Sequence, residues 1–236
     1  MHAEMSDPSM PPEHASAIRD YLSQNQQVSV RVPVLGKEYS GRRGVIQRLV
    51  YDHDDYGPDG GDIGEDSMRI QIDGHPVVVE LCMYIGAEED SCYQRFVRAG
   101  DAFLLVYDVA KRDSFESAVR THRELLGPEQ QQGKPVWVCA TRSDRPPKDW
   151  VVSAQEGSEF SRTIGARFLS VSSKTGQGLD EAFVGQIVRK ALLNRVLISP
   201  AGPGQDLHPK SPQEASCLPL FRVRNKLRGI LNKKAL

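Results

Sequence analysis

The sequence predicts an α/β fold: a mostly parallel, six-stranded sheet with one antiparallel edge pairing and helices on both faces. Apolar, β-rich runs recur at 103–106, 136–140 and 167–171, as is typical of parallel strands buried on both faces. Helical patterns follow these runs, and this alternation favours a parallel sheet. Two further runs, 68–72 and 76–81, flank an Asp-Gly pair, the strongest short signal for an antiparallel hairpin.

The other elements are predicted in chain order from their own patterns. A strand over 28–35 has valines at alternate positions, although Pro33 is unusual in a central strand because it cannot donate to the ladder. A helix is expected over 44–50, and Asp113 and Glu116 have capping-box spacing at the start of another. One face of a long final helix carries Leu179, Phe183, Ile187, Val188, Leu192 and Val196.

The composition is that of a soluble globular protein with tails. Of the 236 residues, 39% are hydrophobic and 26% are charged, and the net charge of -1 argues against bulk electrostatic binding to nucleic acid. The four cysteines have no paired metal spacing, so reduced intracellular thiols are expected. The sequence shows no membrane-span, signal-peptide, myristoylation or prenylation pattern. We therefore expect a cytoplasmic protein, with peripheral attachment to the inner face of a membrane as its other location.

Changes in composition divide the chain into four segments. Residues 1–26 are rich in Pro, Ser, Gln and Glu and are expected to be mostly disordered, with one turn of helix near Ala17 and Ile18. Residues 27–197 form the folded domain, and 198–216 form a Pro/Gly/Ser linker. The basic amphipathic segment 217–236 suits an anionic membrane or a calmodulin-like partner, with a disordered or core-docked tail as the alternative. An acidic loop over 51–66 is expected to be solvated and mobile, with a protein-docking surface as the alternative.

Two polar clusters follow neighbouring strands of the predicted sheet. Thr-Arg-Ser-Asp stands at 141–144, and Ser-Ser-Lys stands at 172–174. Because ligands of doubly wound sheets bind at the carboxyl ends of the strands, both clusters should line one mouth. They resemble the Asn/Thr-Lys-x-Asp and Ser-Ala-Lys motifs of Ras-like small GTPases, and the runs 101–109, 114–116 and 175–183 resemble the family's central strand and two of its helices.

The resemblance implies a P-loop NTPase fold of the small-GTPase type and a guanine pocket. Asp144 would accept two hydrogen bonds from guanine, and such charge-assisted bonds are strong in a dry site. Thr141 would support the loop, Arg142 would lie along the base, and Ser173 would offer a backbone N–H to the guanine oxygen. The expected base-side residues are Thr141, Arg142, Asp144, Ser172, Ser173 and Lys174. The alternative is that the hydroxyl and carboxylate side chains of these clusters only cap the helices that follow.

The stretch 36–43 stands where the family has its phosphate loop, G-x-x-x-x-G-K-[ST]. Gly36 and Gly41 have the required spacing between a strand and a helix. Arg42 replaces the lysine and keeps its charge on a broader, planar head. Arg43 replaces the hydroxyl that holds Mg²⁺, and it cannot ligate a cation. The glycine pattern predicts either a modified phosphate loop or a purely structural turn.

The second magnesium position is also changed. Met83 stands for the aspartate of the family's Asp-x-x-Gly-Gln motif, and Ala87 for the glutamine that orients the attacking water. Gly86 is retained, so its backbone amide would still meet a γ-phosphate. The loop 51–66 contains no threonine that could serve as the family's switch residue. We therefore assign no catalytic and no metal-ligating residue, and we expect Mg²⁺ to be poorly coordinated.

The resemblance covers about 28–196 and predicts a Ras-like protein whose chemistry is impaired. We interpret the chain as a signalling or scaffolding pseudo-GTPase with weak or absent GTP and GDP binding, impaired hydrolysis, and effector- or regulator-type protein partners. One alternative is a divergent but active GTP-binding protein with slow, partner-assisted hydrolysis. The other is a membrane-surface adaptor with a vestigial nucleotide site.

Overall fold

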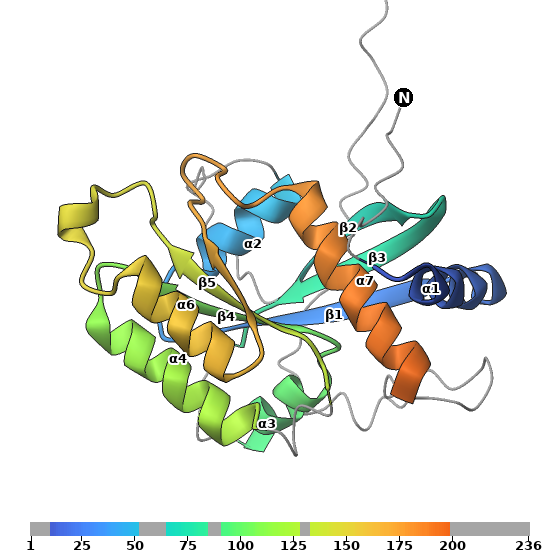
Figure 1. The fold of residues 1–236 in the computed structure, drawn as a ribbon, viewed down its shortest axis with the longest axis horizontal. Coiled ribbons are helices and arrows are strands. Elements are labelled where there is room, and N and C mark those ends of the chain that lie inside the picture. The colour runs from blue at the N-terminus through green and yellow to red at the C-terminus, as the bar shows by residue number, and fades with distance from the viewer. Residues whose placement is uncertain (1–9, 52–64, 85–90, 128–132, 199–236) are drawn as a thin grey trace, which may run out of the picture.

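The structure is a computed structural model that describes residues 10–51, 65–84, 91–127 and 133–198. Its centre is a six-stranded sheet of order β2-β3-β1-β4-β5-β6, in which only the β2–β3 pair is antiparallel (Figure 1). The strands are β1 (Val28–Leu35), β2 (Glu65–Ile72), β3 (His75–Cys82), β4 (Phe103–Asp108), β5 (Val136–Thr141) and β6 (Arg167–Ser170). The predicted α/β fold is confirmed.

Helices cover both faces of the sheet (Figure 1). They are α1 (Pro12–Gln24), α2 (Arg42–Tyr51), α3 (Ser91–Arg98), α4 (Arg112–Leu125), the 3₁₀ turn η1 (Pro147–Asp149), α6 (Ala154–Thr163) and α7 (Glu181–Ile198). Residues of α1, α2 and α7 form one core with the sheet, and residues of α3, α4 and α6 pack into a second. In β4, Leu104 and Val106 belong to the first core and Leu105 and Tyr107 to the second, because successive side chains point to opposite faces. Among the described helices, none is long and apolar enough to cross a membrane.

Strand β1 lies in the middle of the sheet although it contains Pro33. On the β4 side, its ladder consists of Val34 and Leu35, so the missing N–H of Pro33 falls before the paired stretch. The backbone groups of residues 31 and 33 face the same neighbouring strand, because they are two positions apart. The carbonyl oxygen of Arg31 accepts a hydrogen bond from the Asp101 amide at 2.8 Å. The chain leading into β4 therefore crosses the end of the ladder at the proline, and no donor is needed there.

The prediction that residues 1–26 are mostly disordered is wrong for α1. Ile18 is fully buried and Leu22 is 3% exposed, and both belong to the core that α7 shares. Nη1 of Arg195 in α7 donates to the Tyr21 hydroxyl at 3.3 Å. A short apolar stripe at helical spacing is therefore enough to fold this polar segment onto α7.

Several predictions fall outside the described residues. These are the tail 1–9, most of the acidic loop 51–66, the linker 198–216 beyond residue 198, and the whole basic segment 217–236.

Two arginines hold α7 against the sheet. Arg189, whose side chain is 5% exposed, forms a bidentate pair with Asp73 in the β2–β3 turn, with N–O distances of 3.0 and 2.7 Å. Arg195 pairs with Asp101 at 2.8 Å and donates to the Ser29 carbonyl of β1 at 3.0 Å. The predicted Asp-Gly hairpin is thus confirmed, and its turn is fastened to the last described helix.

Candidate functional site

The loops that follow β1, β5 and β6 meet at the carboxyl edge of the parallel strands. Oγ1 of Thr141, the last residue of β5, donates to the Ser40 carbonyl at 2.6 Å and lies 3.0 Å from the carbonyl oxygen of Tyr107. The amide of Ser143 donates to the Val171 carbonyl at 3.2 Å. The structure therefore brings together the polar clusters that the sequence placed at one edge.

The geometry of the loop after β1 requires both of its predicted glycines. Gly36 has φ of 139°, and a Cβ atom there would overlap the carbonyl oxygen of Val106 in β4. Gly41 has φ of 100°, and a Cβ atom there would lie 2.9 Å from Oγ1 of Thr141. The loop passes too close to β4 and β5 for a larger residue at either position.

The backbone amides of this loop form a potential anion site. Within the described residues, the amides of Glu38, Tyr39 and Gly41 donate no hydrogen bond, whereas that of Ser40 donates to the Lys37 carbonyl at 3.2 Å. Unpaired amides in a turn that leads into a helix are typical of phosphate-binding sites.

Helix α2 begins with Arg42 and Arg43, and both side chains are partly exposed. The first turn of α2 contains no acidic residue. The unpaired amides lie beside the positively charged start of α2, an arrangement that is compatible with a phosphate-bearing ligand.

On the base side, the carboxylate of Asp144 is exposed and held in place. Its Oδ1 accepts the Ser172 hydroxyl at 2.7 Å, and the buried Oγ of Ser172 accepts the Thr175 amide at 3.2 Å. Oδ2 of Asp144 and the amides of Ser173 and Lys174 form no hydrogen bond with any residue that the structure describes. An oriented carboxylate beside unpaired amides matches the donors and the acceptor on one edge of guanine.

The capping alternative does not describe these clusters. The turn η1, which follows 141–144, has no side-chain cap. The cap of α6 is Ser153, whose Oγ accepts the Glu156 amide at 3.1 Å. At α7, the Asp180 carboxylate accepts the Phe183 amide at 2.8 Å. Neither cluster therefore caps a described helix, and Ser172 instead joins the two loops through Asp144 and accepts the Thr175 amide within its own turn.

Arg142 makes a contact that the sequence did not predict. Its guanidinium forms an ion pair with the carboxylate of Asp108, which is completely buried at the end of β4. Only the apolar stem of Arg142 is then left to lie along a base. The available signal was an acidic residue that ends a continuously apolar strand, because a buried charge requires a partner.

On the metal side, the described residues offer no comparable set of ligands. Met83 is 8% exposed and belongs to the core that α2 shares, and neither Met83 nor Arg43 carries a side-chain oxygen. In the part of the chain that the structure describes, no group of three His, Cys, Asp or Glu side chains could hold a metal ion. Gly86 and Ala87 lie outside that part. Of the described residues, Arg43 and Met83 therefore supply no ligand for Mg²⁺, whereas the base-side loops are compatible with a guanine base.

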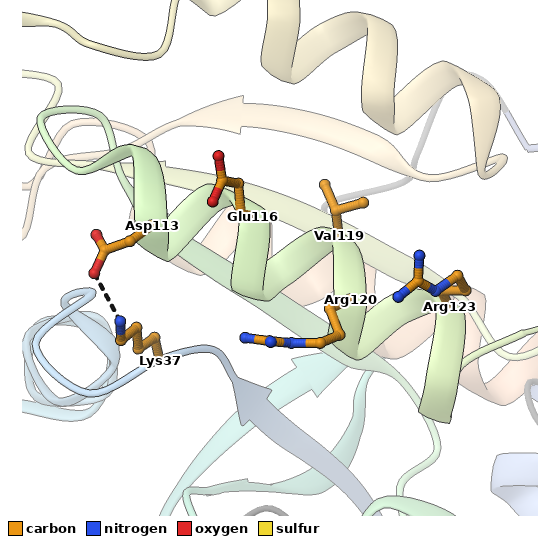
Figure 2. Close-up of a pocket in the computed structure, with 6 residues that line it drawn as sticks. All are labelled: Lys37, Asp113, Glu116, Val119, Arg120 and Arg123. Carbon is orange, nitrogen blue, oxygen red and sulfur yellow. Dashed lines mark hydrogen bonds and ion pairs between the residues drawn. The ribbon is translucent and has the colours of Figure 1, made fainter.

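A separate hollow of about 320 Å³ runs along α4 beside the loop after β1 (Figure 2). At one end, Nζ of Lys37 pairs with the carboxylate of Asp113 at 2.7 Å. Asp113 is thus not the helix cap that its spacing predicted, since α4 begins at Arg112 with no side-chain cap. The remaining lining residues are Glu116, Val119, Arg120 and Arg123. The hollow follows α4 and contains no residue of the base-side loops.

The fold and the loops at its carboxyl edge define the class of this molecule: an α/β protein with the fold of the small GTPases. The family model described as the Ras family matches residues 31–192, well over half of the chain. The chain therefore belongs to the Ras family, and the predicted resemblance is confirmed. This family generally binds GTP and GDP and interacts with effectors and regulators.

Two similar proteins agree with this assignment. A Ras-like protein of Laccaria bicolor is 28% identical over 179 residues, which cover 74% of this chain and 83% of that protein. The Ras-like protein rasC of Dictyostelium discoideum is 31% identical over 116 residues, which cover 49% of this chain and 61% of that protein.

Proposed function

We propose that this Ras-family chain is a signalling or scaffolding pseudo-GTPase, which binds guanine nucleotide weakly and hydrolyses GTP poorly or not at all. One observation carries the proposal. In the base-side loops, a hydrogen bond from Ser172 orients the Asp144 carboxylate. By contrast, the two positions from which the family takes its metal ligands are occupied by Arg43 and Met83. Different side chains serve base recognition and phosphate chemistry, so one can persist where the other is lost.

Recognition of guanine rests on Asp144. Its carboxylate would accept the N1–H and amino hydrogens of guanine, which adenine cannot offer together, and charge-assisted bonds of this kind are strong. The 2.7 Å bond from Ser172 orders the carboxylate before a ligand arrives, which reduces the entropy lost on binding. The amides of Ser173 and Lys174 would meet the guanine oxygen.

Hydrolysis lacks the corresponding support. Phosphoryl transfer is catalysed mainly by positioning and by charge stabilisation, and the loss of one such contact costs about 2.7–4 kcal/mol in the barrier. Arg43 cannot replace a ligating hydroxyl, and Met83 cannot replace a carboxylate. We therefore expect nucleotide binding that does not depend on Mg²⁺, with Arg42 and Arg43 opposing the phosphate charge.

Titration with fluorescent GDP, GTP and ATP analogues, in Mg²⁺ and in EDTA, tests this proposal. The full chain should bind the guanine analogues selectively and equally in both buffers, and Asp144→Ala should abolish the selectivity. A requirement for Mg²⁺ would contradict the metal-side interpretation, and the absence of guanine-selective binding would contradict the nucleotide role. Phosphate release above a boiled control that is lost in Asp144→Ala would favour the active-GTPase alternative.

A role at a membrane surface is a second proposal, favoured by the charge pattern of segment 217–236. This segment contains six basic residues and no acidic one. Each basic residue near an anionic leaflet contributes about 1 kcal/mol to binding. The full chain should sediment with phosphatidylserine vesicles, and a chain ending at residue 216 should not. Equal recovery of the two proteins would exclude this role for the segment.

A further inference from the structure

A buried carboxylate lies under the base-side loop. Asp108 ends β4, has no exposed surface, and stands opposite Thr141 in the parallel β4–β5 register. Its Oδ1 accepts the Ala110 amide at 3.0 Å, and its Oδ2 pairs with the guanidinium of Arg142. A buried carboxylate without a cation is strongly unfavourable, so Asp108 holds Arg142 to this place.

The Asp108–Arg142 ion pair and the hydrogen bonds of the adjacent residues hold the backbone here in one conformation. Arg142 has φ of 60°, a conformation that residues other than glycine keep only where their surroundings enforce it. The amide of Val109, next to Asp108, donates to the Thr141 carbonyl at 3.3 Å. The amide of Ser143, next to Arg142, donates to Val171 at 3.2 Å. The ends of β4, β5 and β6 are thus joined around the pair.

We propose that Asp108 is a positioning residue for guanine recognition, which acts through Arg142. With the guanidinium engaged, the apolar stem of this 38% exposed side chain becomes a fixed platform for the base, two residues before Asp144. Asp108 does not touch the nucleotide, because it has no exposed surface. This inference deepens the proposed function and depends on guanine binding at the same site.

A double-mutant cycle on the full chain tests the proposal. Asp108→Asn keeps the shape of the side chain and removes its charge, whereas Arg142→Met removes the charge of the partner and keeps its stem. Each should raise the Kd for a fluorescent GDP analogue about tenfold, and the double variant should be no worse than either single one, because all three lose the same ion pair. Arg142→Lys, which keeps both stem and charge, should bind nearly as well as the wild type.

A second carboxylate–arginine pair, in which Arg189 is buried and Asp73 is 16% exposed, supplies a control. Asp73→Asn breaks the pair with Arg189 in the β2–β3 turn and should lower Tm without changing the Kd. A general loss of stability is thereby separated from a loss at the nucleotide site. If a single variant does not fold, the double variant, which leaves neither charge without its partner, must give the tenfold loss.

Affinity of Asp108→Asn or Arg142→Met within about twofold of the wild type, or additive losses in the double variant, would overturn the proposal. A wild type without guanine-selective binding would refute the proposed function, and hydrogen exchange then decides the role of Asp108 separately. In the nucleotide-free protein, Asp108→Asn should accelerate exchange at the amides of Val109 and Ser143, whereas Asp73→Asn should not. Unchanged exchange at both amides would overturn the positioning role.

Discussion

The base-side and phosphate-side loops share one edge of the sheet but are held in different ways. The base side is fixed by side chains, through the Asp144–Ser172 hydrogen bond and the Asp108–Arg142 ion pair. The loop after β1 is fixed by the shape of its backbone, which fits against β4 and β5 where only glycine leaves room. When a loop is held by its backbone, its functional side chains can be substituted without a change in the backbone conformation. This difference supports the proposed function, in which base recognition persists although the metal ligands are lost.

The largest expected effect comes from breaking the backbone fit of the phosphate-side loop. Gly36→Ala would force a Cβ atom into the Val106 carbonyl and should lower the free energy of unfolding by about 3 kcal/mol or more. Gly74→Ala is the matched control, because Gly74 also has positive φ, 81°, but has no neighbouring atom within 4 Å of the added Cβ. It should cost only about 1 kcal/mol. Equal costs in urea denaturation would show that the close approach to β4 is unimportant.

Removing the link between the two loops should have a smaller effect. Thr141→Val deletes the hydroxyl that donates to the Ser40 carbonyl and should cost about 1–3 kcal/mol, because a buried acceptor loses its donor. Thr163→Val also deletes a donor, to the Phe160 carbonyl, but at an exposed position, and should cost less than about 0.5 kcal/mol. Urea denaturation of both variants measures the difference. If the two costs were the same, the loops would not be coupled through Thr141.

Restoring one metal ligand should change nucleotide binding rather than stability. Arg43→Ser returns a hydroxyl to the first turn of α2 and should make the affinity for a GTP analogue about threefold tighter in Mg²⁺ than in EDTA, since Mg²⁺ is held by few side chains plus phosphate oxygens. Arg42→Ser should show no such gain. A wild type that already prefers Mg²⁺ would contradict the assignment of Arg43 as a lost ligand position.

The smallest effect, little or no chemical modification, is expected at Cys139 in β5, the strand that leads into the base-side loop. Cys139 is fully buried in β5, and burial raises the pKa of its thiol to about 12, which disfavours the reactive thiolate. In a Cys217→Ser background, iodoacetamide should modify the partly exposed Cys92 and leave Cys139 unmodified until the protein is denatured. Modification of native Cys139 would show that β5 opens.

The sheet could be predicted because buried strands and tight turns leave local patterns in the sequence. Helix α1 could not be predicted from composition, since the two buried residues Ile18 and Leu22 barely change the average of a polar segment. The Asp108–Arg142 pair joins residues 34 positions apart, and no local pattern encodes such a contact. The expected cap at Asp113 fails because α4 begins one residue earlier, at Arg112, and the Asp113 carboxylate pairs with Lys37 instead.

The two arginine anchors of α7 have a mechanical consequence. Arg189 clamps the helix to the hairpin at the edge of the sheet, and Arg195 clamps it to Asp101 and Ser29 near the middle. A pulling force on the chain beyond Ile198 would act on both arginine ion pairs and be distributed over the edge and central strands. The domain would then yield as a unit under tension instead of shedding its last helix turn by turn.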